Sequence, residues 1–259
     1  MNMSTNYLRN SFPQVDKMPN IKIFGNPEEV GEYAASYWFK KIEANPRLTM
    51  LLSSGKSPIP VYQHMAGLIE KYELNVRGLT AIMQDEYIDL SDETLSYAHY
   101  AREYISKPFG MDESQLHFPN GNAFLIQEEC RRYESLIQRL GPIDFGLLGI
   151  GPEGNVHLGL NERGTDPSIG VHVARLLPQT LAANDYVATT AITVGMPTIL
   201  NTSEILVIAT GFKKARSVKE ALTAEISMEC PATLLRLREN VTWILDTEAA
   251  MLLPRNYCE

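Results

Sequence analysis

Short apolar segments that alternate with helix-like segments constrain this chain more than any other feature. The clearest is EILVIATG at 204–211, an apolar run followed at once by the helical pattern FKKARSVKEAL. Similar runs occupy 48–53, 79–83, 143–151 and 241–246. Apolar runs of this length, without polar alternation, are typical of strands buried on both faces. The sequence therefore predicts a three-layer α/β fold, with a mostly parallel, Rossmann-like sheet covered by helices on both faces.

The segments between these runs carry helix signals. Pro27, Glu28 and Glu29 open one helix, because proline suits a first turn and acidic side chains complement the helix dipole. The charged stretch 126–140 is amphipathic and ends at a Gly-Pro pair, as helices commonly do. Further predicted elements are strands at 21–25, 171–174 and 186–195 and helices at 58–72 and 96–105.

Composition places the chain among ordinary globular proteins. Of its 259 residues, 44% are hydrophobic and 21% are charged, which excludes a disordered or fibrous chain. No linker rich in proline, glycine or serine divides it. We therefore expect one domain over residues 21–259, preceded by a flexible arm over residues 1–20.

The charge balance argues against two classes of partner. Lys and Arg total 23 and Asp and Glu total 31, giving a net charge of −8. An acidic chain lacks the basic footprint expected of nucleic-acid binding or of an anionic membrane surface. Its apolar runs are too short to cross a bilayer, and its three cysteines lie far apart, which suits a reducing compartment. These features predict a cytoplasmic protein with no membrane or nucleic-acid partner.

Polar loops at the ends of predicted strands are the candidate binding sites. In parallel sheets, ligands bind beyond the carboxyl ends of the strands. The loop of Ser53, Ser54, Gly55, Lys56 and Ser57 offers small side chains and backbone N–H groups to an anion at a helix start. The alternative is a plain turn with a serine cap. Lys214 lies in the first turn of the helix after 204–211, where the helix dipole opposes a positive charge. A bound anion would remove this conflict. The alternative is a lysine that is simply solvated.

Candidate proton-transfer groups follow two other strands. Asp85 lies at the end of 79–83, beside a second acid, and such a pair is either a base or a solvated loop. The glycine-rich loop after 143–151 brings Asn155, His157 and Glu162 within eight residues. Histidine is the natural acid–base group near neutral pH, and a neighbouring carboxylate would fix its orientation. No Cys/His cluster or HExxH motif predicts a metal site.

Taken in order, the motifs LSSGKSP, QDEY, GIG…HLGLNE, TVGM and ATGFKKA resemble the glucosamine-6-phosphate deaminase/isomerase family, which shares a superfamily with 6-phosphogluconolactonases. The resemblance covers residues 21–246. It implies conversion of a 2-amino-2-deoxyhexose 6-phosphate to a ketohexose 6-phosphate and ammonia, with no metal or organic cofactor. The implied partner is therefore a phosphorylated amino sugar, and a homo-oligomer is left open.

The resemblance also implies roles for residues. Asp85 would move a proton between C2 and C1, His157 would assist ring opening, and Glu162 would support His157. Asn155 stands where the family usually has an aspartate. The phosphate would be held by the serine loop and a lysine, namely Ser53, Ser54, Gly55, Ser57 and Lys214.

The chain departs from the family pattern at several positions. Lys56 replaces a usual glycine and either adds a phosphate contact or intrudes on the site. Leu181 stands where many glucosamine-specific members have a phosphate-binding arginine, and Arg163 where proline is usual. Asn155 and the HLGLNE motif resemble the galactosamine-6-phosphate branch more closely. Two alternatives follow: an isomerase or lactonase that releases no ammonia, and a non-catalytic sugar-phosphate sensor.

Overall fold

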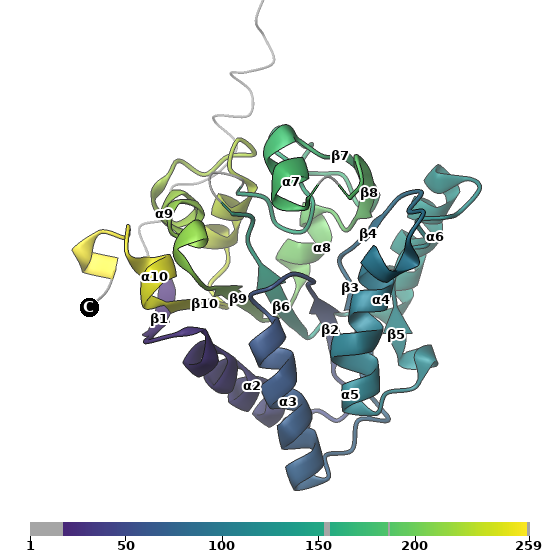
Figure 1. Cartoon of the computed structure of the whole chain (residues 1–259), viewed down its shortest axis with the longest axis horizontal. Helices are drawn as coiled ribbons and strands as arrows, with labels where there is room; N and C mark the ends of the chain where they lie inside the picture. Colours follow the sequence, from purple (N-terminus) through teal and green to yellow (C-terminus); the bar gives the residue numbers. More distant parts are fainter. Residues whose placement is uncertain (1–17, 153–155, 186, 258–259) are drawn as a thin grey trace, which may run out of the picture.

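The computed structural model describes residues 18–152, 156–185 and 187–257. Within these residues, one parallel sheet runs through the centre of the molecule (Figure 1). Its seven strands lie in the spatial order β1 (Asn20–Phe24), β10 (Val241–Asp246), β9 (Ile205–Ala209), β6 (Phe145–Gly149), β2 (Thr49–Leu52), β3 (Thr80–Met83) and β5 (Leu116–His117). Every neighbouring pair is parallel. The predicted fold class is confirmed.

Alternate side chains of each strand enter two separate cores. On β2, Leu51 packs into one core, whereas Met50 and Leu52 pack into the other. On β9, Val207 and Leu206 divide in the same way. Because successive strand residues point to opposite faces, a strand between two helical layers must be apolar throughout. This is why the uninterrupted apolar runs predicted the sheet correctly.

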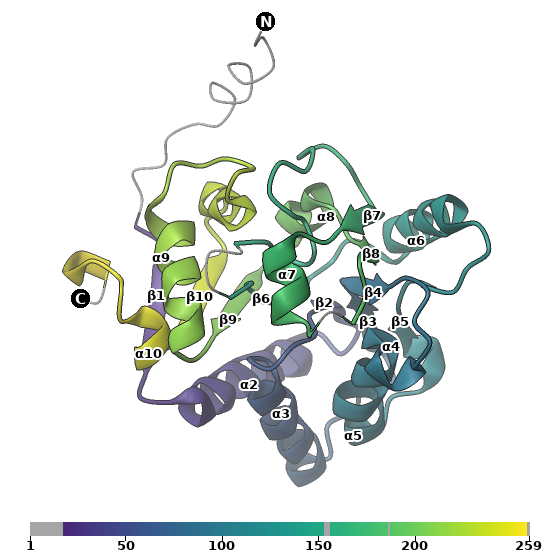
Figure 2. The same cartoon turned by 45° about the horizontal axis from the view of Figure 1, so that its top comes forward.

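Helices cover both faces of the sheet (Figures 1 and 2). One layer contains α2 (Pro27–Ala44), α3 (Ile59–Tyr72), α4 (Tyr97–Ala101), the π-helical turn η2 (Arg102–Ser106) and α5 (Lys107–Phe109). The other contains α6 (Ile126–Leu140), α8 (Met196–Asn201), α9 (Ala215–Thr223), the 3₁₀ helix η5 (Pro231–Leu237) and α10 (Thr247–Ala250). Single 3₁₀ turns are η1 (Glu93–Leu95), η3 (Glu113–Gln115), η4 (Phe212–Lys214) and η6 (Arg255–Tyr257).

The start of α2 follows its sequence signals. The Asn26 side chain accepts a hydrogen bond of 3.0 Å from the Glu29 backbone N–H, and Pro27 occupies the first turn. The buried face of α2 carries Trp38, which stacks on Phe145 of β6 with ring centroids 5.8 Å apart. An aromatic pair of this kind contributes about 0.5 to 1.5 kcal/mol beyond its buried area. The helix is thereby fixed against the strand that leads into the glycine-rich loop.

A second, smaller sheet was not predicted. It is antiparallel and consists of β4 (Asp85–Tyr87), β8 (Thr190–Thr193) and β7 (His172–Arg175). Asp85 was predicted at the end of 79–83, in an acidic pair that is either a base or a solvated loop. The solvated-loop alternative is wrong, because the chain continues directly into β4 and Asp85 is buried. Helix α7 (Pro178–Ala183) lies beside this sheet and was also not predicted. Leu181 of α7 packs against the small core beneath the sheet.

The ends of the predicted domain are only partly described. Most of the arm predicted over residues 1–20 lies outside the described residues, and Asn20 already begins β1. The interpretation of residues 21–259 as one domain stays a prediction. Among the described residues, no helix combines the length and apolar character that a membrane crossing requires.

Candidate active site

A pocket of about 120 Å³ opens beyond the carboxyl ends of the central strands, where the small sheet meets the large one. Eight of the ten predicted site residues line it: Ser53, Ser54, Gly55, Lys56, Ser57, Asp85, His157 and Lys214. Asn155 lies outside the described residues. Glu162 is not among the residues that line this pocket. Four segments from separate parts of the sequence therefore meet at one cavity.

The loop between β2 and α3 forms one wall. Its Gly55 has a φ of +106°, a conformation that other residues rarely adopt. The Tyr100 hydroxyl donates a 2.7 Å hydrogen bond to the Gly55 carbonyl, which holds the loop from the side. Ser53 is only 4% exposed, and its hydroxyl has no hydrogen-bond partner among the described residues. A buried hydroxyl without a partner facing a pocket is available to a ligand.

Lys214 reaches the same wall from the turn after β9. Its ammonium group donates a hydrogen bond to the Ile150 carbonyl at the end of β6. The turn is fixed at Gly211, whose φ is +85° and whose N–H donates to the Asp246 carboxylate at 2.9 Å. Burial lowers the pKa of Lys214 to about 8. A half-buried cation therefore stands beside the serine loop.

Asp85 lies where the chain passes from the large sheet to the small one. It is 6% exposed, and its carboxylate accepts a 3.1 Å hydrogen bond from the Leu160 backbone N–H. Burial raises the pKa of Asp85 to about 7, against the opposing effect of hydrogen bonds from Thr193 and Leu160. The neighbouring charge of Glu86 raises the pKa further. Asp85 thus exchanges its proton near neutral pH.

Gly159 allows the loop to approach Asp85 closely. Its φ is +54°, and a Cβ built there would lie 3.1 Å from both the Asp85 Oδ1 and the Thr193 hydroxyl. Such a contact is tighter than most real side chains make, so any larger residue would displace the carboxylate. The glycine-rich loop is therefore shaped around Asp85.

His157 is half-buried in the same loop, and its Nδ1 is hydrogen-bonded to the Gly159 carbonyl. A carbonyl only accepts, so Nδ1 carries the proton of the neutral ring and Nε2 is the basic nitrogen. Burial, followed by the nearby charge of Lys214, lowers the pKa of His157 to about 4. The imidazole is therefore neutral at physiological pH.

The hydrogen bonds of Glu162 differ from those expected of a residue that orients His157. Its carboxylate accepts hydrogen bonds from the Leu177 N–H, at 3.1 Å, and from the Thr180 hydroxyl at the start of α7. Among the described residues, no hydrogen bond joins it to His157. Burial raises the pKa of Glu162. Glu162 fastens the loop to α7, and the His157 ring is held instead by the Gly159 carbonyl.

Three pocket residues with polar side chains were missed as site residues: Gln84, Tyr97 and Asn184. Tyr97 was assigned to packing, and its ring does lie 4.5 Å from the Tyr87 ring, but it also lines the pocket. Gln84 had a usable signal, since it directly precedes Asp85 at a strand end. Asn184 had none, because α7 was not predicted.

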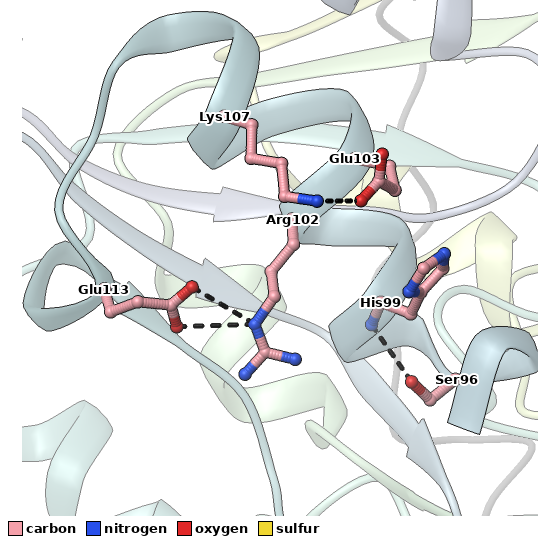
Figure 3. A network of polar contacts seen from close by, with 6 residues as sticks. All are labelled: Ser96, His99, Arg102, Glu103, Lys107 and Glu113. Carbon is pink, nitrogen blue, oxygen red and sulfur yellow. Dashed lines mark hydrogen bonds and ion pairs between the residues drawn. The ribbon is translucent and has the colours of Figure 1, made fainter.

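The helix that carries Tyr97 and Tyr100 is anchored on its other side by polar contacts (Figure 3). The Ser96 hydroxyl accepts a 3.0 Å hydrogen bond from the His99 N–H and caps α4. Arg102 pairs with Glu113 at 3.2 Å, and Lys107 pairs with Glu103. The pair of Arg102 and Glu113 joins this helical run to the turn η3, whereas the pair of Lys107 and Glu103 lies within the run. Exposed ion pairs contribute little stability, and these contacts do not supply a site.

The described residues contain no group of three or more His, Cys, Asp or Glu side chains that could hold a metal ion. Fold and pocket together define an α/β protein with a candidate ligand pocket at the carboxyl ends of its parallel strands.

The particular family follows from sequence comparison. Residues 26–243 match the model of the family described as glucosamine-6-phosphate isomerases/6-phosphogluconolactonase, and the chain belongs to that family. The galactosamine branch of the earlier resemblance is not distinguished by this match.

Curated relatives agree with the assignment. The glucosamine-6-phosphate deaminase of Clostridium perfringens (strain 13 / Type A) is 36% identical over 236 residues, covering 88% of this chain and 97% of the relative. Glucosamine-6-phosphate deaminase 1 of Bacillus subtilis (strain 168) is 37% identical, covering 88% and 96%. These relatives support an enzymatic function.

Solved structures give the same result. A monomeric glucosamine-6-phosphate deaminase superposes with a TM-score of 0.86 at 35% identity, covering 90% of this chain and 99% of its own. The 6-phosphogluconolactonase of Trypanosoma brucei superposes with a TM-score of 0.73 at 22% identity, covering 91% and 99%. The second match, at its low identity, shows the shared fold alone.

Proposed function

We propose that this chain converts a 2-amino-2-deoxyhexose 6-phosphate, with water, into the ketohexose 6-phosphate and ammonia. The observation that carries the proposal is the sharing of one pocket by a carboxylate that titrates near neutrality, a neutral imidazole, and an anion cradle. The names of the relatives, all glucosamine-6-phosphate deaminases, support the same reaction.

The phosphate group occupies the end of the pocket formed by the serine loop and Lys214. Ser53 offers an unpartnered hydroxyl and Lys214 a positive charge, and the exposed Lys56 stands at the rim. A charged hydrogen bond to phosphate is stronger than a neutral one. Binding the tail at a fixed point orients the reacting carbons toward Asp85 and lowers the entropic part of the barrier.

His157 opens the sugar ring. Its Nε2 accepts the proton of the C1 hydroxyl while the C1–O5 bond breaks, and the same proton is then delivered to O5. The products are a C1 aldehyde and a C5 hydroxyl. A neutral imidazole suits this step because it must first accept a proton and then release it.

Asp85 moves the proton between the two carbons. Its carboxylate removes the proton from C2, the electron pair forms the C1=C2 double bond, and the C1 oxygen takes up a proton from solvent. Asp85 then returns its proton to C1, and the nitrogen lone pair forms a C2=N bond that carries a positive charge. Water adds to C2, and a proton passes from that oxygen to nitrogen. Ammonia then leaves as the C2 carbonyl forms, and the remaining proton of the C2 oxygen returns to solvent. General acid–base steps contribute roughly 10²- to 10⁴-fold each.

We assign the preferred substrate to the galactosamine-6-phosphate branch. Leu181 supports this assignment, because it packs against the small-sheet core and supplies no charge where many glucosamine-specific members have an arginine. Asn155 supports it from the sequence alone. Oligomeric state, cytoplasmic location and the absence of nucleic-acid partners stay predictions, and one relative is described as monomeric.

The test is ammonia release from glucosamine 6-phosphate and galactosamine 6-phosphate, measured with a coupled assay, with formation of the ketohexose 6-phosphate followed in parallel. We expect release from both, faster from the galactosamine form. His157→Ala should lose turnover, whereas His99→Ala, at a half-buried position that does not line this pocket, should retain it. Absence of ammonia from either sugar would overturn the proposal. Hydrolysis of 6-phosphogluconolactone instead would establish the lactonase alternative.

A further inference from the structure

Among the described residues that line the pocket, Gln84 is a buried polar side chain that the proposed reaction leaves without a role. It is 2% exposed and lines the pocket, and its amide nitrogen has no hydrogen-bond partner among the described residues. Leaving a buried amide donor unpaired is costly, because the group loses its hydrogen bond to water and gains none in return. Buried polar groups are nearly always paired, so this one requires an explanation.

The backbone around Gln84 is held from both sides. Its N–H donates to the Leu52 carbonyl at 3.2 Å, and its carbonyl accepts from the Val194 N–H at 2.9 Å. Leu52 ends β2 of the large sheet, and Val194 follows β8 of the small sheet. Gln84 is thus the residue at which the chain crosses from one sheet to the other. These two backbone hydrogen bonds fix the position from which the Gln84 side chain extends at the pocket wall.

The two neighbours of this position locate it within the pocket. Leu52, which bonds its backbone, directly precedes Ser53 of the anion cradle, and Asp85 directly follows Gln84. Gln84 therefore lies between the phosphate end and the proton-transfer end. In a hexose 6-phosphate bound across these two ends, the groups between them are the oxygens on C3, C4 and C5.

We propose that Gln84 is a substrate-binding residue whose carboxamide hydrogen-bonds a hydroxyl group on the middle carbons of the sugar, C3 to C5. The inference rests on the proposed function, whose phosphate and proton-transfer ends it uses. The last side-chain torsion of glutamine has a broad energy minimum, so the carboxamide turns toward a ligand at little cost. An unpaired donor in the empty pocket then becomes paired when the sugar binds.

The test replaces the amide with an apolar group of similar length, Gln84→Met. Binding of galactosamine 6-phosphate, glucosamine 6-phosphate and inorganic phosphate is measured by calorimetry with wild type and variant. We expect the sugar phosphates to bind about tenfold more weakly, the effect of about 1.4 kcal/mol, and inorganic phosphate to bind unchanged. Gln63→Met, on the exposed face of α3, is the matched control and should change neither.

A stability measurement separates a binding role from a structural one. If Gln84 serves the ligand, removing its unpaired amide raises the melting temperature of the ligand-free protein, because methionine fills the space without a buried polar group. A structural glutamine would give the opposite sign. Gln84→Asn, which keeps an amide but draws it back by one carbon, should weaken sugar binding without the gain in stability.

Each outcome bears on the inference independently of turnover. Unchanged sugar binding in Gln84→Met would overturn it, and so would equal weakening of the sugar phosphates and of inorganic phosphate, which would place the residue at the anion cradle. Failure of the wild-type chain to release ammonia would overturn the proposed reaction alone, since binding of the sugar phosphates can still be compared.

Discussion

The two ends of the pocket belong to two different sheets and treat charge in opposite ways. At the proposed phosphate end, loops of the parallel sheet leave Lys56 exposed and Lys214 half-buried, and the Ser53 hydroxyl has no partner among the described residues. At the other end, the small sheet buries Asp85 between Thr193 and Leu160. One end keeps its charge available to an anion, whereas the other suppresses charge until a proton must move. Burial at the second end raises the pKa of Asp85 to about 7.

Asp85→Asn should break the proton-transfer end alone and has the largest expected effect. The amide keeps the hydrogen bond from Leu160 but cannot accept the C2 proton. We expect kcat to fall by about a thousandfold, within the range for a lost general base. Binding of inorganic phosphate, measured by calorimetry, should be unchanged because the anion cradle is intact.

The same variant should gain stability with a characteristic pH dependence. The folded-state pKa of Asp85 is about 7, above the ordinary value of 3.8. Ionisation therefore favours the unfolded chain, and the stability of wild type falls as pH rises from about 4 to about 7. The melting temperature of Asp85→Asn should exceed that of wild type at pH 8 and match it at pH 3. Asp89→Asn, an exposed control, should show neither effect, and a pH-independent difference would contradict the burial argument.

The parallel sheet was predictable because its signals are local. Ile205–Ala209 is apolar on both faces, and Asn26 and Pro27 mark a helix start without reference to the rest of the chain. The small sheet was not predictable, since β4 has only three residues, two of them acidic. The acidic side chains of β4 are buried because β4 pairs with β8, which lies about a hundred residues later in the sequence. No local sequence pattern indicates this pairing.

The candidate site also combines features that local sequence predicts with features that it does not. Ser53 and Lys214 were predicted as site residues because each follows an apolar strand, where ligands of parallel sheets bind, and both line the pocket. Among the described residues, no hydrogen bond joins Glu162 to His157 as expected, because Glu162 accepts from Leu177 and Thr180, at the start of a helix that was not predicted. The nearest carbonyl, that of Gly159, holds the ring instead. Spacing in sequence located the loop but not its internal hydrogen bonds.

Lys214→Met should sharpen the comparison from the phosphate end. Loss of a charged hydrogen bond costs about 1.5 to 3 kcal/mol, so KM for the sugar phosphate should rise roughly tenfold to a hundredfold. We expect kcat to fall far less, because Asp85 keeps its partners. Steady-state kinetics on the neighbouring exposed Lys213→Met variant should match wild type. A large fall in kcat with constant KM would show that Lys214 acts in the chemical steps.

The pH profile should show both ends in one curve. Asp85 must be ionised to accept a proton, and Lys214 must be protonated to attract phosphate. Their pKa values of about 7 and about 8 predict a bell-shaped plot of kcat/KM, which reports the free enzyme, with limbs near these values. Lys214→Met should remove the alkaline limb and keep the acid one. A profile flat between pH 6 and pH 9 would contradict both assignments.

Thr193→Val gives the smallest expected effect and tests the small sheet most directly. The Thr193 hydroxyl hydrogen-bonds the Asp85 carboxylate and lowers its pKa against the effect of burial. Valine has nearly the same shape but no hydroxyl, so the pKa of Asp85 should rise and the acid limb of kcat/KM should move to higher pH. Activity above that limb should be close to wild type, because the ionised carboxylate is still the base. An unmoved acid limb would mean that a group other than Asp85 sets it, and the division between the two ends of the pocket would then need another carboxylate.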